Sequence, residues 1–259
     1  MLTVLTVSGF RHLKFGAIDS TNAQARRLAD KGEGGPVWIT ATEQIAGRGR
    51  RGRDWVSKPG NLFATFLVTL PVAPATASQV SFVTALALHD ACAGFLSGQS
   101  ELSLKWPNDV LLNERKLAGI LLETVPCNDT GKTGLAIGCG VNLQHAPETA
   151  IYPVTFLNEH TDRPVLADML IEELASHMDA RLSQWQMGKR FDLTAKAWQE
   201  RASHVGQKIS MRNDAETVTG RFLALADDGA LILEMDDGTQ KHFHAGDVSL
   251  RPQTDKREF

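Results

Sequence analysis

Several features that would place a protein in a common class are missing from this chain of 259 residues. It has three cysteines, an odd number without paired spacing, so we expect a reducing compartment and neither a disulfide framework nor a structural metal site. The first segment, 1–10, lacks a basic start, a long apolar run and a small-residue cleavage site, which argues against a signal peptide. Pro71 and Pro74 interrupt the best apolar stretch. We therefore expect no membrane span and a cytoplasmic location.

An excess of positive charge is missing too. Lysine and arginine number 27 against 30 aspartate and glutamate, whereas a protein held on nucleic acid by phosphate neutralisation is usually basic. Aromatic side chains that might stack on bases are also sparse, since the chain has a single tyrosine and only Trp55 lies close to the arginine-rich segment 47–53. A nucleic-acid-binding adaptor, the alternative from a different functional class, is therefore disfavoured.

What the sequence does contain is a succession of strand patterns with few helices between them. Apolar and β-branched runs predict strands at 10–18, 37–42, 62–70, 102–105, 110–112, 117–123 and 134–142. Apolar residues at helical spacing predict helices at 22–29, 76–96, about 164–185 and 191–202. Because four of the strands follow one another directly, we expect an α+β fold whose mixed or antiparallel sheet is flanked by helices.

The pattern changes after residue 203. Short strand-like runs follow at 208–211, 217–226, 230–235, 239–244 and 248–250, and the Asp-Asp-Gly sequences between them are hairpin signals. We expect a main domain of residues 1–203 and a small SH3-like β-barrel of residues 204–259.

The most unusual segment is Gly-Arg-Gly-Arg-Arg-Gly-Arg at 47–53, called the arginine loop below. Glycine lets the backbone turn sharply and approach a ligand, and arginine presents planar donor forks that match carboxylate and phosphate oxygens. The loop is therefore expected to wrap an anion, and a phosphate-bearing ligand is the first candidate. These seven residues alone are also compatible with a solvated basic loop.

Three further polar segments are embedded in apolar sequence: Asp-Ser-Thr-Asn at 19–22, Lys-Trp-Pro-Asn-Asp at 105–109 and Arg-Lys-Leu-Ala-Gly at 115–119. Each alone has an ordinary explanation, as a helix cap, a turn or a hairpin with a solvated lysine. Together with the arginine loop and with 138–142, in this order, they resemble the biotin protein ligase family. These enzymes attach biotin to the biotin carboxyl carrier domain of acetyl-CoA carboxylase and related carboxylases. The resemblance covers almost the whole chain.

The resemblance implies a class II synthetase-like catalytic domain and a reaction in two steps. Biotin and ATP, with Mg²⁺, give biotinyl-5′-AMP and pyrophosphate, and a carrier lysine then takes the biotinyl group. In the first step a carboxylate approaches a phosphate, and the two anions repel each other until cations and fixed dipoles offset their charge.

The resemblance also implies the site residues. Catalysis is assigned to Lys116, Arg48 and Arg50, of which Lys116 is a compact charge able to reach the α-phosphate and the reacting carboxylate. The implied biotin site is Ser20, Thr21, Gln44, Gly47, Arg48, Arg50, Trp55, Lys116 and Gly119. The implied nucleotide site is Arg51, Arg53, Lys105, Trp106, Asn108, Asp109, Asn142 and Tyr152. Asp109 is the expected contact for Mg²⁺ through water, and Tyr152 is a candidate for stacking on adenine.

Further expectations concern partners and rival activities. Because the chain begins almost at the first catalytic strand, we expect ligase activity without an N-terminal DNA-binding domain and without sequence-specific DNA binding. Homodimerisation through an exposed sheet edge stays open. The nearest rival is a lipoate ligase or octanoyltransferase, but Gln44 with Ser20 and Thr21 favours the ureido ring of biotin over a plain acyl chain.

Overall fold

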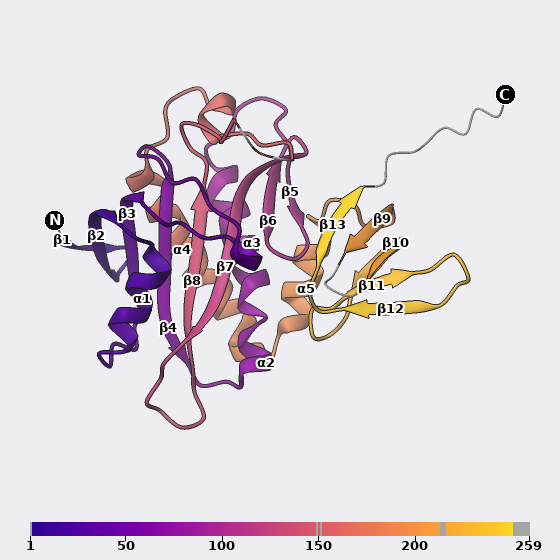
Figure 1. Cartoon of the computed structure of the whole chain (residues 1–259), viewed down its shortest axis with the longest axis horizontal. Coiled ribbons are helices and arrows are strands. Elements are labelled where there is room, and N and C mark those ends of the chain that lie inside the picture. Colours follow the sequence, from indigo (N-terminus) through magenta and orange to yellow (C-terminus); the bar gives the residue numbers. More distant parts are fainter. Residues whose placement is uncertain (1, 149, 151, 213–215, 251–259) are drawn as a thin grey trace.

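The structure, a computed structural model, describes residues 2–148, 150, 152–212 and 216–250 (Figure 1). A large sheet covered by helices occupies most of the molecule, and a smaller sheet built from the C-terminal residues lies beside it (Figure 1). Within the described residues, no helix is both long and apolar enough to span a membrane.

The large sheet has eight strands in the order β1-β2-β3-β4-β8-β7-β6-β5. The described pairs are antiparallel except β2 with β3, which are parallel. The predicted mixed sheet is therefore confirmed. Its strands are β1 (Leu2–Val7), β2 (Phe10–Ile18), β3 (Val37–Gln44), β4 (Leu62–Leu70), β5 (Leu102–Lys105), β6 (Asp109–Leu112), β7 (Arg115–Val125) and β8 (Thr133–Val141). Strand β1 was not predicted.

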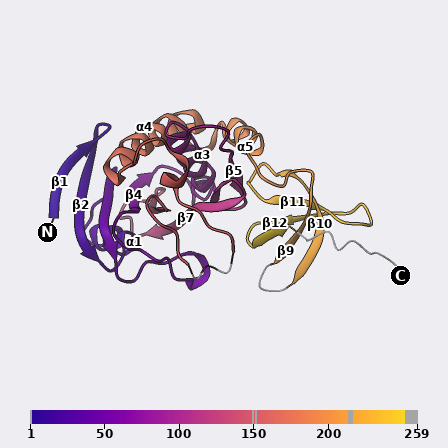
Figure 2. The same ribbon diagram turned by 90° about the horizontal axis from the view of Figure 1, so that it is seen from above.

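Helices cover both faces of this sheet (Figure 2). Helix α1 (Thr21–Ala29) makes the crossover that parallel β2 and β3 require, and Ser20 caps it by accepting a hydrogen bond from Ala23 N at 3.0 Å. Helices α3 and α4 cover the opposite face (Figure 2). Besides α1, the α-helices are α2 (Pro74–Ala77), α3 (Val80–Ala93), α4 (Ala167–Trp185) and α5 (Phe191–Gln199). Short 3₁₀ helices lie at Arg50–Gly52, Leu157–His160 and Gln186–Gly188.

Three helix predictions need correction at their ends. The helix predicted over 76–96 is two helices, α2 and α3, with a break at residues 78–79. Helix α4 begins at Ala167 rather than near Pro164, and α5 ends at Gln199 rather than at residue 202. Helix α3 is apolar on nearly all sides because it packs between the sheet and α4.

The main core lies between the sheet and α3 and α4. Trp38 and Phe66 pack with ring centroids 4.8 Å apart. The Cys139 side chain also lies in this core, where burial raises the pKa of its thiol to about 12. The thiol therefore stays neutral, as expected for a cysteine that only packs.

The C-terminal strands form a separate antiparallel sheet in the order β12-β11-β10-β9-β13. The predicted small C-terminal β domain is confirmed, but its sheet is not closed as a barrel: β13 pairs with β9, β12 pairs with β11, and no described pairing joins the two ends of the sheet. Trp106 Nε1 donates to Gly229 O at 3.2 Å and so ties this sheet to the large one. The strands are β9 (Lys208–Arg212), β10 (Thr217–Leu225), β11 (Leu231–Glu234), β12 (Gln240–Phe243) and β13 (Asp247–Leu250).

Candidate active site

A cavity of about 840 Å³ lies between β6, β7 and β8 of the large sheet, the arginine loop and the C-terminal sheet. All four segments singled out in the sequence reach it, although up to about a hundred residues separate them along the chain. Its lining includes these predicted residues: Ser20, Thr21, Gln44, Arg48, Arg50, Arg53, Trp55, Lys105, Trp106, Asn108, Asp109, Lys116, Gly119 and Tyr152.

One end of the cavity carries neutral polar groups held in fixed orientations. Gln44 Oε1 accepts hydrogen bonds from Thr21 N at 2.8 Å and Thr21 Oγ1 at 3.1 Å. Gln44 Nε2 donates to Ser57 Oγ at 2.9 Å. The amide is therefore oriented from both sides before any ligand arrives, and a neutral polar ligand meets little rearrangement here.

Glycines make the adjacent wall flat. A Cβ atom at Gly140 would stand 2.5 Å from the Trp55 indole, and one at Gly119 would stand 3.1 Å from it. The ring can lie against β7 and β8 only because these positions carry no side chain. Trp55 Nε1 is buried and has no hydrogen-bond partner among the described residues, which leaves a donor beside the cavity.

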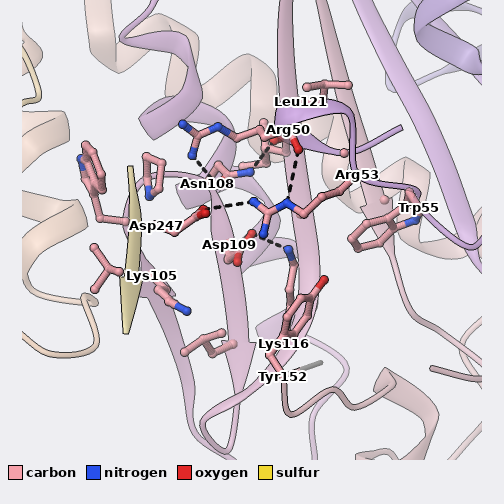
Figure 3. A pocket seen from close by; sticks show the side chains of 18 of the residues that line it. Arg50, Arg53, Trp55, Lys105, Asn108, Asp109, Lys116, Leu121, Tyr152 and Asp247 are labelled. Carbon is pink, nitrogen blue, oxygen red and sulfur yellow. Dashed lines mark hydrogen bonds and ion pairs between the residues drawn. The ribbon is translucent and has the colours of Figure 1, made fainter. Parts of the chain in front are cut away.

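Lys116 stands at the wall of the cavity on β7, with its side chain 15% exposed. Its Nζ lies 2.7 Å from Asp109 Oδ1, and the aromatic rings of Trp55 and Tyr152 lie near it (Figure 3). The ring centroids are 5.4 Å and 5.3 Å from Nζ, within the range of cation–π contacts. A freely solvated strand lysine, the ordinary explanation of this residue, does not fit these contacts.

The arginine loop is a short hairpin with its tip at Arg50–Gly52. Gly49 N donates to Arg53 O at 2.7 Å and Trp55 N donates to Gly47 O at 2.9 Å. At the tip, Arg51 has φ 55° and Gly52 has φ 69°, a left-handed turn that glycine adopts without strain.

The arginines of this loop reach three different partners. Arg48 Nη2 lies 3.3 Å from Glu123 Oε1, and Arg50 Nη1 donates to Asn108 Oδ1 at 3.1 Å. In the C-terminal sheet, Asp247 accepts from Arg51 at 3.1 Å and from Arg53 at 3.0 Å (Figure 3 shows the second contact). The loop is therefore fastened to both sheets.

The electrostatics of the cavity favour an anion. Its lining has seven cationic side chains, Arg48, Arg50, Arg53, Lys105, Arg115, Lys116 and Arg212, against four carboxylates, Asp54, Asp109, Glu114 and Asp247. Burial lowers the pKa of Arg50 and of Lys105, and Asp109 opposes this in both cases. Burial tends to raise the pKa of Asp247, but Arg53 and Arg51 outweigh it and hold that pKa below its usual range. Because the cationic side chains outnumber the carboxylates, a bound anion would stabilise the charged form of these partly buried cations.

Three predicted residues lie outside this lining. Gly47 has a structural reason to be glycine, because a Cβ there would stand 2.5 Å from Ser57 Oγ and from Trp55 O. Arg51 is held by Asp247. The Asn142 side chain is not part of the cavity lining. It donates to Thr155 O at 3.0 Å and thereby anchors the segment after residue 152.

Sequence reasoning missed a partly buried hydrogen-bond network beside the arginine loop. Asn22 Nδ2 donates to Glu123 Oε2 at 2.8 Å, and Thr65 Oγ1 donates to Asn22 Oδ1 at 2.7 Å. Glu123 also receives Arg48, so the network joins α1, β4 and β7 to the loop. The available signal was a lone carboxylate seven residues after Lys116 in an otherwise apolar strand.

No cluster of three or more histidine, cysteine, aspartate or glutamate residues that could hold a metal ion occurs in the described residues. Asp109 is the carboxylate nearest to Lys116, and it projects into the same cavity (Figure 3). One carboxylate of this kind suits Mg²⁺ that arrives bound to nucleotide phosphates, because such Mg²⁺ takes only one or two carboxylates from a protein.

Comparison with known proteins identifies the family. The model of the Biotin/lipoate A/B protein ligase family matches residues 16–142, and the Biotin protein ligase C terminal domain matches residues 204–251. A biotin–acetyl-CoA-carboxylase ligase of Paracoccus denitrificans is 40% identical over 86% of this chain and 93% of its own length. The chain belongs to the biotin/lipoate A/B protein ligase family.

Other members of the family match over most of the chain. The bifunctional ligase/repressor BirA of Escherichia coli (strain K12) is 32% identical over 90% of this chain and 72% of its own length. The biotin protein ligase of Aquifex aeolicus, solved in complex with biotin and ATP, superposes with a TM-score of 0.76 and 25% identity over 93% of this chain and 98% of that chain.

Proposed function

We propose that this member of the family is a biotin–acetyl-CoA-carboxylase ligase. It activates biotin with ATP as biotinyl-5′-AMP and transfers the biotinyl group to a lysine of the biotin carboxyl carrier domain of acetyl-CoA carboxylase. The 40% identical relative with this name and the matching fold of a ligase solved with biotin and ATP support the proposal. The observation that carries it is a single cavity joining a preoriented neutral polar end, at Gln44, to Lys116 and the arginine loop.

Biotin occupies the end of the cavity near Gln44 in this proposal. Its ureido ring exchanges hydrogen bonds with Ser20, Thr21 and Gln44, and the Trp55 indole lies against it over the glycine wall. Neutral donors and acceptors suit an uncharged ring in a partly dry pocket better than charged residues do. The carboxylate of biotin then points toward Arg48, Arg50 and Lys116.

In the first step the biotin carboxylate attacks the α-phosphorus of ATP, and pyrophosphate leaves. Lys116 contacts the α-phosphate and the attacking carboxylate, and Arg50 holds the phosphate from the other side. These cations stabilise the negative charge that builds up between two anions, which is the main electrostatic obstacle to the reaction. Lys105, Arg53 and Asn108 border the remaining phosphates.

Mg²⁺ is part of the proposal as a companion of ATP. Asp109 would contact it through water, and the ion would neutralise phosphate charge. The protein residues carry the other tasks: Lys116 and the arginines bind and orient the reacting groups, while the arginine loop excludes water.

In the second step the amine of the carrier lysine attacks the carbonyl carbon of the adenylate. The new carbon–nitrogen bond forms as the bond to AMP breaks, and the lysine loses a proton. A mixed anhydride hydrolyses readily, so the arginine loop must cover it until the carrier arrives. Glu123 and Asp247, which hold the two sides of the loop, fit this task.

We also propose the molecular setting of the enzyme. Residues 1–203 form the catalytic domain and residues 204–259 the C-terminal domain, whose Asp247 acts by anchoring the loop. The protein works in the cytoplasm and does not bind specific DNA sequences. A homodimer forms through β1, an edge strand without charged residues in which Val4 is 62% exposed. A Val4→Lys variant that sediments as the parent does would refute this dimer.

The experiment that tests the function measures pyrophosphate release from Mg²⁺-ATP in the presence of biotin, lipoate or octanoate in separate reactions, without a carrier. Release with biotin alone is expected. Release with lipoate or octanoate alone would assign the protein to that branch of the family. No pyrophosphate release with any of the three acids, together with salt-dependent retention on nucleic acid, would favour the nucleic-acid-binding adaptor instead.

A further inference from the structure

The feature that carries a further inference is the aromatic pair around Lys116. Trp55 and Tyr152 come from different parts of the chain, and their rings stand 5.4 Å and 5.3 Å from Lys116 Nζ. Figure 3 shows Lys116 Nζ with the Tyr152 ring on one side and Trp55 on another, while Asp109 approaches from a third direction. All four side chains line the same cavity.

The backbone determines where Tyr152 stands. Lys116 N donates to Pro153 O at 2.9 Å, and Thr155 N donates to Lys116 O at 3.0 Å, so residues 153–155 run beside Lys116 as a short parallel bridge. The Asn142 side chain holds the same segment through Thr155 O. Tyr152, directly before this bridge, is thereby carried to the Lys116 side chain, although thirty-five residues separate the two in sequence.

We propose that Tyr152 is a positioning residue for Lys116, which it holds, together with Trp55, at the place where the carboxylate and the α-phosphate meet. This rests on the proposed ligase function. It differs from the role in adenine stacking that the sequence suggested, because the contact of Tyr152 in the structure is with the ammonium group of Lys116.

The physical advantage lies in how an aromatic face holds a cation. A lysine side chain is flexible, and fixing it in one rotamer before the reaction costs conformational entropy. A carboxylate such as Asp109 orients the ammonium group but also neutralises it, and competes with the substrate anions. The ring faces attract the ammonium group through their quadrupoles and add no negative charge. Lys116 can then exchange Asp109 for a substrate oxygen and keep its contacts with the two rings.

The test is a series at position 152, assayed by biotin-dependent ATP–pyrophosphate exchange with the full chain. Tyr152→Leu should lower kcat roughly two- to fivefold, as expected for one partly exposed cation–π contact, and leave KM for ATP unchanged. Tyr152→Phe should restore most of kcat because the ring face remains. Pentafluorophenylalanine at 152 keeps the shape of the ring but removes its negative face, so it should behave like leucine.

The matched control is pentafluorophenylalanine at Phe156, four residues further along the same segment, where the described residues give no cation–π contact; it should leave kcat unchanged. If Tyr152→Leu raises KM for ATP at constant kcat, the ring serves adenine and the proposal is wrong. It is equally wrong if the fluorinated ring at 152 behaves like phenylalanine.

A second measurement does not depend on activity. After reductive ¹³C-methylation, the NMR signal of Lys116 should carry a ring-current shift that decreases in Tyr152→Leu and is preserved in Tyr152→Phe. An unchanged signal in Tyr152→Leu would contradict the contact. A protein that shows the shift but no exchange with biotin would refute the ligase function and leave the contact standing.

Discussion

Lys116 is the residue on which the chemistry depends. Its side chain is mostly buried, paired with Asp109 and flanked by two aromatic rings, so its charge faces a cavity rather than bulk water. The proposed role predicts a loss of transition-state stabilisation rather than of substrate binding when it is removed.

Lys116→Ala should lower the biotin-dependent ATP–pyrophosphate exchange rate by roughly 100-fold or more, a typical loss for one group that stabilises charge in the transition state. The dissociation constant of biotin, measured by calorimetry without ATP, should change little. Lys132→Ala, which removes a lysine from the turn before β8, is the matched control. Equal losses in affinity and in rate would reduce Lys116 to a binding contact.

At the scale of the element, the arginine loop is a hairpin held by ion pairs with Glu123 in the large sheet and with Asp247 in the small one. The Arg51–Asp247 and Arg53–Asp247 pairs are partly exposed, so each alone stabilises the closed loop only slightly. Two guanidinium groups on one carboxylate still bias the loop toward the cavity, and this bias governs how long the adenylate is retained.

Asp247→Asn should shorten the lifetime of bound biotinyl-5′-AMP roughly two- to fivefold, the range expected when exposed ion pairs worth up to about 1 kcal/mol are lost. The decay is measured by rapid filtration in the absence of carrier. Asp227→Asn, in the turn between β10 and β11, removes the same charge from the same domain and should retain the parent lifetime. Similar decay rates in the parent and both variants would show that Asp247 of the C-terminal domain does not influence how long the loop retains the adenylate.

Arg50→Gly tests shielding within the loop itself. It removes the hydrogen bond to Asn108 and a cation beside the phosphates, so release and hydrolysis of the adenylate should both accelerate. The measurement compares free and enzyme-bound adenylate by mass spectrometry over time. Adenylate that remains bound as long as in the parent would rule out a shielding role.

What could be predicted from the sequence depends on how local the cause is. Strands β2 and β4 can be predicted from runs of apolar and β-branched residues. Ser20 predicts the start of α1, because an N-cap residue hydrogen-bonds within the first turn of its own helix. Strand β1 has a run of the same kind as β2 and β4 and could have been predicted from it, although five of its six residues are exposed. Asp247 and Arg51 are 196 residues apart, so their ion pair follows from the packing of the two sheets and has no local signal.

At the scale of the whole molecule, a partly buried ion pair joins two of the helices that cover the sheet, α3 and α4. Asp90 on α3 accepts a hydrogen bond from Arg181 Nε of α4 at 2.8 Å. Burial tends to raise the pKa of Asp90, but His89 and Arg181 outweigh it and lower the pKa to about 2. Because this folded-state pKa lies below the unfolded value, the pair stabilises the fold above about pH 4, and its contribution is lost as the pH falls toward 2.

Asp90→Asn should therefore lower the free energy of unfolding at pH 7 by about 1–2 kcal/mol, an amount reduced from the full pKa shift because the pair is partly solvated. The difference from the parent should shrink as the pH falls from 4 to 2. Urea unfolding at several pH values measures it. Asp179→Asn, at an exposed position of α4, is the control, and an Asp90→Asn effect that does not vary with pH would contradict the electrostatic explanation.

Biotin transfer by this protein can be measured as the mass of a purified biotin carboxyl carrier domain after incubation with the protein, Mg²⁺-ATP and biotin. The carrier should gain one biotinyl group, a carrier whose acceptor lysine is replaced should gain none, and Lys116→Ala should abolish the gain. A carrier that stays unmodified with the parent protein would contradict this function.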